Sequence, residues 1–132
     1  MKIQQSAEDY LESILVLGMN RPYVRSIDVA NDLGFSKPSV SVAMKNLREN
    51  GYISMSQEGH ITLLEPGRKI AQTIYERHTT LSGLLELLGV PKEIAADDAC
   101  RIEHVISPES FDAIKAAYGK LQDGSGKKID KE

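Results

Sequence analysis

Residues 26–64 constrain the fold more than any other part of the chain. Two short stretches with apolar residues at helical spacing, 26–33 and 36–49, are separated by Gly34. A glycine between two short helices permits the tight turn of a helix-turn-helix. Alternating stretches on both sides of residues 57–59 are typical of a β-hairpin. The segment is therefore predicted to be a helix-turn-helix followed by a hairpin, which together form a winged helix.

Helices are also expected on both sides of this segment. Apolar periodicity favours helices at 6–19, 66–88, 92–106 and 107–121. The predicted fold class is mainly α, with an N-terminal winged helix-turn-helix, a small β-hairpin wing and a following all-helical domain.

Changes in composition along the chain predict three parts. Residues 1–64 form the winged-helix domain, and residues 65–121 form a helical domain that begins with a long linking helix. Residues 122–132 are rich in Gly, Ser, Lys and Asp and are expected to be a flexible tail.

Serines mark the expected helix starts. Ser6, Ser26 and Ser36 stand where side chains can cap the first, second and third helices. Pro38 follows Ser36 in the first helical turn, where the missing N–H of proline has little cost.

Composition excludes several classes of protein. The net charge of the 132 residues is −3, so any contact with nucleic acid must come from a local basic patch. A single cysteine permits no internal disulfide and suits a reducing compartment. No stretch approaches the roughly 20 apolar residues of a membrane span, and the first residues do not resemble a signal peptide. A cytoplasmic protein is expected.

The predicted recognition helix carries the features of a DNA-binding face. From position 21 to position 51 there are five Lys and Arg residues against three acids, so this region is locally positive. Small hydroxyl side chains at the start of the helix permit close approach to phosphates and base edges. The residues expected to contact DNA are Arg25, Ser36, Lys37, Pro38, Ser39, Ser41, Lys45 and His60. Helix-turn-helix geometry also occurs in domains that bind no nucleic acid, but here the helix pair, the serines and the wing occur together.

A second pattern lies near the end of the chain. Cys100, Glu103 and His104 stand at i, i+3 and i+4, which places their side chains on one face if the segment is helical. A thiol, a carboxylate and an imidazole together suit a divalent transition metal. Three ligands leave the coordination incomplete, so other segments must supply the rest.

Three further residues have ordinary interpretations when each is taken alone. Asp9 suits a helix-capping acid, Glu12 a solvated helix face and His78 a hydrogen-bonded polar residue in the long helix.

Several motifs in one order resemble the diphtheria-toxin-repressor family of metal-dependent regulators, in its short manganese-regulator branch. Ser-Ala-Glu-Asp-Tyr-Leu-Glu opens the first helix, and Ser-Lys-Pro-Ser-Val-Ser opens the recognition helix. Arg-Lys-Ile-Ala precedes Glu-Arg-His on the long helix, and Asp-Asp-Ala-Cys-Arg-Ile-Glu-His-Val follows. The resemblance covers residues 6–121.

The resemblance implies a set of metal ligands, which are Asp9, Glu12, His78, Cys100, Glu103 and His104. Manganese regulators resemble this chain at Asp9 and Glu12 but carry Glu at the position of Cys100. Iron-responsive members carry Cys there but lack the two acids. The implied cofactor is Mn2+ or Fe2+, with Co2+ or Zn2+ possible in vitro, and one or two ions per subunit.

The resemblance also implies a mode of action. The chain would be a homodimer that binds a palindromic operator in double-stranded DNA, with metal as corepressor and metal-ion homeostasis as the controlled process. Neither an enzymatic activity nor a membrane association is expected.

Three alternatives share part of these features. A metal-independent winged-helix regulator that responds to an organic ligand or a protein partner leaves Cys100, Glu103 and His104 unexplained. A metal-dependent hydrolase would need a base motif such as His-Glu-x-x-His, which the chain lacks. A structural metal site is usually a closed set of Cys and His and not an open site rich in carboxylates.

Overall fold

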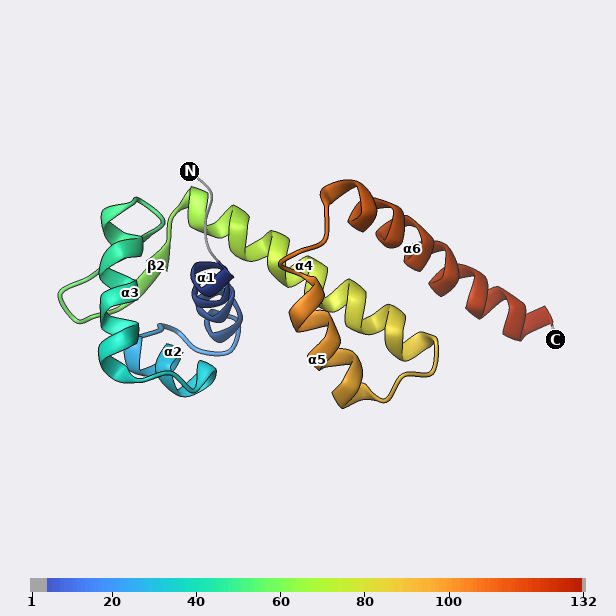
Figure 1. Cartoon of the computed structure of the whole chain (residues 1–132), viewed down its shortest axis with the longest axis horizontal. Helices are drawn as coiled ribbons and strands as arrows, with labels where there is room; N and C mark the ends of the chain where they lie inside the picture. The colour runs from blue at the N-terminus through green and yellow to red at the C-terminus, as the bar shows by residue number, and fades with distance from the viewer. Residues whose placement is uncertain (1–4, 132) are drawn as a thin grey trace. The chain divides into compact units, whose positions relative to one another are not determined.

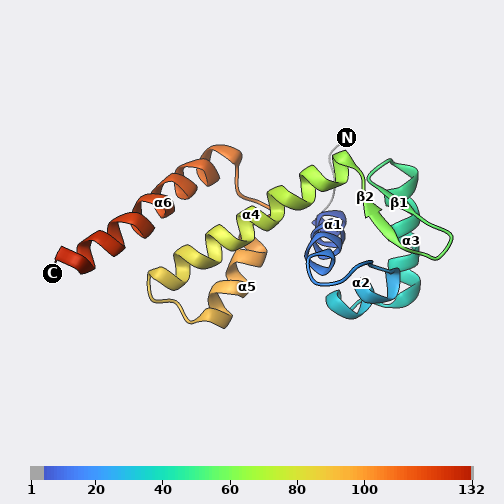
Figure 2. The same cartoon turned by 180° about the vertical axis from the view of Figure 1, so that it is seen from behind.

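The computed structural model describes the backbone of residues 5–131 and the side chains of residues 5–123. Six helices and one small sheet follow one another in the order α1–α2–α3–β1–β2–α4–α5–α6 (Figures 1 and 2). This mainly helical winged fold confirms the predicted fold class. Two compact units divide the chain between Tyr75 and Glu76. Within residues 5–131, no helix combines the length and the apolar character needed to cross a membrane.

The first unit is the winged helix. It contains α1 (Gln5–Gly18), α2 (Ser26–Leu33), α3 (Lys37–Glu49), β1 (Ile53–Met55) and β2 (Ile61–Leu63). Helix α1 packs against α2, α3 and β2, so it forms the centre of the unit (Figure 1). The core side chains share near-complete burial and include Leu11, Ile14, Val29, Val40, Met44, Leu47, Ile53 and Ala71.

The turn between α2 and α3 has the features that the sequence predicts. Gly34 ends α2 with φ 72°, in the left-handed region that favours glycine. Ser36 is the N-cap of α3, and its Oγ accepts a hydrogen bond from the backbone N–H of Ser39 at 3.3 Å. Pro38 lies in the first turn of α3, as expected.

Two predicted caps are wrong. Ser6 lies inside α1, which already includes Gln5. Ser26 is the first residue of α2, and Arg25 is its N-cap. An acid takes over the capping role there, because the carboxylate of Asp28 accepts the backbone N–H of Arg25 at 2.9 Å.

The wing is an antiparallel hairpin of two three-residue strands, which confirms the predicted hairpin. Ile53 pairs with Leu63 and Met55 with Ile61. Val24, in the connection between α1 and α2, adds an isolated bridge to Ile61. The sheet therefore links the wing to the connection that precedes the helix-turn-helix.

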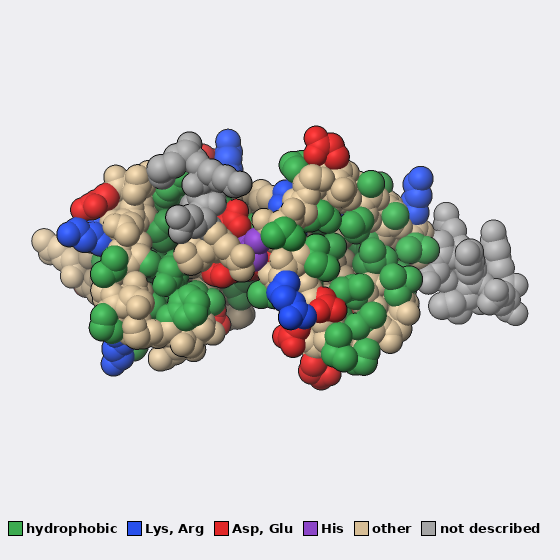
Figure 3. All heavy atoms as spheres, in the orientation of Figure 1, with side chains coloured by type: hydrophobic (Ala, Val, Ile, Leu, Met, Phe, Trp, Pro, Cys, Tyr) green, Lys and Arg blue, Asp and Glu red, His purple; other side chains and the backbone are tan. Residues whose placement is uncertain are grey.

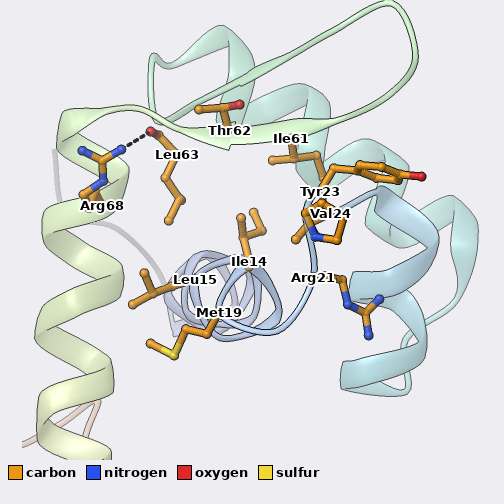
Figure 4. A pocket seen from close by; sticks show the side chains of 12 residues that line it. Ile14, Leu15, Met19, Arg21, Tyr23, Val24, Ile61, Thr62, Leu63 and Arg68 are labelled. Atoms are coloured by element: carbon orange, nitrogen blue, oxygen red, sulfur yellow. Dashed lines mark hydrogen bonds between the residues drawn. The ribbon is translucent and has the colours of Figure 1, made fainter.

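Helix α4 (Glu65–Leu87) begins against the wing. A side chain at Gly67 would overlap the backbone oxygen of Tyr52, so this close approach requires glycine. Arg68 Nη2 donates a hydrogen bond to the backbone oxygen of Leu63 at 3.3 Å (Figure 4). These contacts fix the first turn of α4 on the winged helix.

The second unit contains the C-terminal part of α4, α5 (Lys92–Ile102) and α6 (Pro108–Lys131). The chain turns back after α4, and α5 runs back along it (Figure 1). Helix α6 also packs on α4, because Lys115 Nζ lies 2.5 Å from the carboxylate of Glu76 and the Tyr118 ring lies against Gly83.

The predicted helix at 92–106 extends too far, because α5 ends at Ile102. Residues 103–105 form a turn in which Val105 N–H donates to Ile102 O at 3.0 Å. Pro108 disfavours a helical conformation in the residue before it, so the helix cannot run directly into α6.

The C-terminal segment differs from the sequence prediction in its backbone. Helix α6 continues to Lys131, through most of the expected flexible tail at 122–132. The side chains from residue 124 onward, and Glu132 altogether, lie outside the described residues.

Candidate metal centre and DNA-binding face

Glu103 is the central acidic side chain of the second unit. Its side chain is 1% exposed, and it lies in the turn after α5. The Nδ1–H of His78, on α4, donates to Oε1 of Glu103 at 2.8 Å. His104 Nε2 lies 3.5 Å from Oε2 of the same carboxylate, and its side chain is 2% exposed. Two imidazoles from different elements thus converge on one buried carboxylate.

The second oxygen of this carboxylate indicates what the cluster can hold. Among the described residues, Oε2 of Glu103 is buried and accepts no hydrogen bond. Burying a carboxylate oxygen without a hydrogen bond or a positive charge has a large desolvation cost. A divalent cation removes that cost, and oxygen and imidazole nitrogen are donors that Mn2+ and Fe2+ accept. The residues in the second unit therefore fit a metal.

Cys100 differs from the two residues with which the sequence groups it. It lies inside α5 and is exposed, whereas Glu103 and His104 lie in the turn with buried side chains. Among the described residues, Cys100 does not belong to a group of three potential ligands whose donor atoms lie within 4.8 Å of one another.

Asp9 and Glu12 belong to the first unit. Both lie on α1, three residues apart, and both are partly buried. Side chains at this spacing lie on the same side of a helix. Burial raises the pKa of the neighbouring Tyr10 hydroxyl, and the negative charge of Asp9 raises it further. The pair is therefore a local concentration of negative charge on one helix face.

Arg77 is a functional candidate that sequence reasoning missed. Its Nη1 donates to the backbone oxygens of Glu103, at 3.1 Å, and Ile106, at 3.2 Å. The guanidinium also lies over the ring of Phe111, 5.7 Å from its centroid. Arg77 thus bonds two carbonyls of the connection after α5 and so fixes the backbone that carries Glu103. The only sequence signal was its position directly before His78.

The expected DNA-binding residues lie in the first unit, in two groups. Lys37, Ser39, Ser41 and Lys45 are exposed on α3, and Ser36 precedes it with Pro38 in the first turn. Arg25 and His60 form the second group, because Arg25 Nη2 lies 3.3 Å from His60 Nε2.

The second group includes a residue that the sequence did not single out. The ring of Tyr23 stacks on His60 with a centroid distance of 4.0 Å. The guanidinium of Arg25 lies 5.2 Å from the centroid of the Tyr23 ring. The stack holds Arg25 beside the wing, where a basic side chain can meet a phosphate.

A groove of about 390 Å³ also lies in the first unit. Figure 4 shows apolar side chains of α1 and β2 pointing into it, including Ile14, Leu15 and Leu63. Its described lining has Arg21 and Arg68 but no carboxylate, thiol or imidazole. The groove is therefore not a place for a divalent cation.

Comparison with protein families gives two matches that together span most of the chain. Residues 2–61 match the model described as the N-terminal DNA-binding domain of iron-dependent repressors. Residues 64–130 match the model described as the metal-binding and dimerisation domain of the same repressors.

Curated relatives agree with these matches. The transcriptional regulator MntR of Salmonella typhimurium is 38% identical over 109 residues, which are 83% of this chain and 69% of the relative. An uncharacterised HTH-type transcriptional regulator of Methanocaldococcus jannaschii is 33% identical over 92% of this chain and 98% of its own length.

A solved structure extends the likeness to three dimensions. A manganese-dependent transcriptional repressor in complex with manganese superposes with a TM-score of 0.77 at 29% identity, over 86% of this chain. This chain spans about half of that protein, with 52% covered. The resemblance drawn from the sequence motifs is confirmed, and the chain belongs to the iron-dependent repressor family, which includes the diphtheria-toxin-repressor-like regulators of the MntR type.

Proposed function

We propose that this chain is a metal-dependent DNA-binding transcriptional repressor that controls metal-ion homeostasis. One observation carries the proposal. A buried carboxylate, Glu103, meets two imidazoles and keeps an open oxygen, in a chain whose first unit is a winged helix. Such a site is costly without a cation, and DNA recognition gives a reason to sense one.

The proposed ligands are those implied by the family resemblance. His78, Glu103 and His104 supply the donors of the second unit, and Cys100 adds a thiol from α5. Asp9 and Glu12 supply carboxylates from the first unit. One buried carboxylate leaves half of a divalent charge uncompensated, and the two acids of α1 are proposed to provide the remaining negative charge.

The bound ion, proposed to be Mn2+ or Fe2+, supplies positive charge that neutralises several carboxylates at once. Without that charge, the acids repel one another and favour separation of the elements that carry them. With the ion bound, that repulsion is removed. This proposal links metal binding to DNA binding, and the linkage is reciprocal, since each ligand must raise affinity for the other by the same factor.

The proposed DNA contacts are Arg25, Ser36, Lys37, Pro38, Ser39, Ser41, Lys45 and His60. Helix α3 would enter the major groove, while Arg25 and His60 would meet the sugar–phosphate backbone beside the wing. Such a domain binds one half-site, so a palindromic operator requires two copies of the chain.

An apolar surface on the second unit supports a homodimer. Leu87, Leu88, Ile94 and Val105 are between 44% and 79% exposed. Figure 3 shows hydrophobic side chains spread over the face of this unit that is turned toward the viewer. Exposed apolar patches of this kind mark interaction surfaces, and a second copy of the chain is the proposed partner.

Further parts of the proposal concern location and organisation. The winged-helix domain is assigned to residues 1–64, the metal-binding and dimerisation domain to 65–121 and a tail to 122–132. A repressor acts where the chromosome is, so the chain is proposed to be cytoplasmic. No catalytic role is proposed for any of its residues.

The test is an anaerobic titration of DNA binding. Duplexes selected from a random library in the presence of Mn2+ serve as probes, and affinity is measured with chelator, Mn2+ and Fe2+. We expect strong binding only with metal, and Glu103→Gln should abolish the metal response. Glu93→Gln, the same change at an exposed position of α5, serves as control and should leave it intact. Equal affinity with chelator and with metal would overturn the proposal.

A further inference from the structure

Helix α3 has two chemically distinct faces. Val40, Met44 and Leu47 are at most 5% exposed and pack into the core of the first unit. The opposite face, which the core does not cover, is otherwise polar and includes Ser41, Lys45 and Asn46 among its exposed residues. Two exposed apolar residues interrupt this polar face, Pro38 in the first turn of α3 and Val42 in the second.

Among residues 5–75 of the first unit, Val42 is the most exposed large hydrophobic residue. Its exposure is 61%, against 1% for Val40 two positions earlier. At 100° per residue, Val42 lies almost opposite the centre of the buried stripe formed by Val40, Met44 and Leu47. Its two methyl groups therefore point away from the protein.

The helix itself gives no reason for a valine at this position. A β-branched side chain loses rotamer freedom in a helix, and an exposed position offers no packing that compensates for it. A single exposed apolar residue on a protein surface is common and needs no explanation. Val42, however, stands in the second turn of a recognition helix, among the side chains that would reach base edges.

We infer that Val42 reads the 5-methyl group of a thymine in each half-site of the operator, and so determines sequence specificity at that position. The inference rests on the proposed function, since it requires α3 to enter the major groove. There, the methyl group of thymine is the one apolar feature among the base edges, and apolar side chains are its natural contact.

The neighbours of Val42 supply complementary readout. Lys45, one turn further along α3, can donate to a phosphate or a guanine edge, and Asn46 has the donor and acceptor that match an adenine edge. Neither group can distinguish thymine from uracil, because those two bases differ only in the methyl. Sensitivity to that methyl must therefore come from an apolar side chain of this face, either Val42 or Pro38, and the response of Val42→Ala decides between them.

The experiment is a double-mutant cycle between protein and DNA. A duplex is selected from a random library with the wild-type chain and Mn2+, and each thymine is then replaced in turn by 2′-deoxyuridine. Affinities are measured for the wild type and for Val42→Ala. Alanine favours the helix and Val42 packs on nothing in the core, so the variant should fold, and its thermal melting curve verifies this.

The wild type should lose about fourfold in affinity when one particular thymine per half-site loses its methyl, as expected for about 0.8 kcal/mol of buried methyl group. Val42→Ala should be insensitive to the same replacement, with a change below about 1.5-fold. Lys45→Ala is the matched control on the same face. It should weaken binding overall and retain the fourfold sensitivity to the methyl, because a lysine makes charge contacts.

Equal losses for the wild type and Val42→Ala at every thymine would overturn the inference while leaving the proposed function intact. Failure of the wild type to bind any duplex with Mn2+ or Fe2+ would instead overturn the proposed function, and this inference with it.

Discussion

Replacing Glu103 by Gln should make the metal-free protein more stable and the metal response disappear. Glutamine keeps the size and the acceptor oxygen of the side chain but removes its charge. In wild type, Oε2 of Glu103 is buried without a hydrogen bond among the described residues. A neutral group of the same shape has a lower desolvation cost. The same substitution should therefore stabilise the metal-free protein and remove its response to metal.

The magnitude follows from the contacts of the carboxylate. An unsatisfied buried polar group costs about 1–3 kcal/mol, and more if it is charged. The change weakens one charge-assisted hydrogen bond, from His78 Nδ1–H at 2.8 Å, to a neutral one, a loss of about 1 kcal/mol. The net gain in the free energy of unfolding is therefore up to about 2 kcal/mol, or up to roughly 8 °C in Tm.

The assay is denaturation followed by circular dichroism, with chelator and with Mn2+. At a free metal concentration 100 times Kd, the wild type should gain about 2.7 kcal/mol, and Glu103→Gln should gain nothing. Glu93→Gln should match the wild type in both conditions. If Glu103→Gln is less stable than the wild type in chelator, Glu103 is a structural ion-pair partner of the histidines and the reasoning fails.

Three further predictions follow from other positions. Cys100→Glu should shift the metal preference of DNA binding toward Mn2+ in anaerobic titrations, because a carboxylate replaces a softer thiolate; an unchanged preference would exclude the thiol as a ligand. Gly67→Ala should destabilise the first unit by about 1–3 kcal/mol in urea denaturation, because its Cβ would overlap the backbone oxygen of Tyr52. Gly119→Ala, where a Cβ meets nothing within 4 Å, should be neutral or stabilising. Arg77→Met should cost about 1–3 kcal/mol with chelator and also weaken Mn2+ binding measured by calorimetry, whereas a merely structural role would change only the first quantity.

Local sequence rules predicted the winged helix well. The turn glycine at position 34, the Ser36 cap and Pro38 are signals that act within a few residues of where they stand. The apolar periodicity of α3 also gave its buried face correctly, with Val40, Met44 and Leu47 in the core. Such features depend on backbone geometry and solvent exclusion, which a short window of sequence already contains.

The end of α5 shows where local rules fail. Nothing between residues 92 and 106 marks a stop at Ile102, and the connection that follows is bonded by Arg77, which lies 26 positions before Glu103. A turn whose carbonyls bond a distant guanidinium has no local signal in the sequence.

The N-cap of α2 is a second feature that the local sequence rules predicted wrongly. Propensity favours serine as an N-cap, and Ser26 was available, but the helix begins one residue earlier. The carboxylate of Asp28 bonds to the backbone N–H of Arg25, while its other oxygen lies 3.0 Å from Arg21. The two interactions of the Asp28 carboxylate stabilise this helix start more than one hydroxyl cap from Ser26 would. A short window of sequence does not show which of these hydrogen bonds forms.

The exposure of the potential ligand atoms affects which metal ions the second unit can bind selectively. Its buried donors are a carboxylate and an imidazole, on Glu103 and His104, whereas the thiol of Cys100 is exposed. An ion held by the buried donors alone meets oxygen and nitrogen, which suits Mn2+ and Fe2+. Recruiting the thiol requires Cys100 to leave solvent and the end of α5 to adjust, and Arg77 opposes that movement by holding the carbonyls of Glu103 and Ile106. Binding of a thiophilic ion should therefore carry a conformational cost that binding of Mn2+ does not. Because Arg77→Met loosens the turn, it should reduce the difference in affinity that this cost produces between the two kinds of ion.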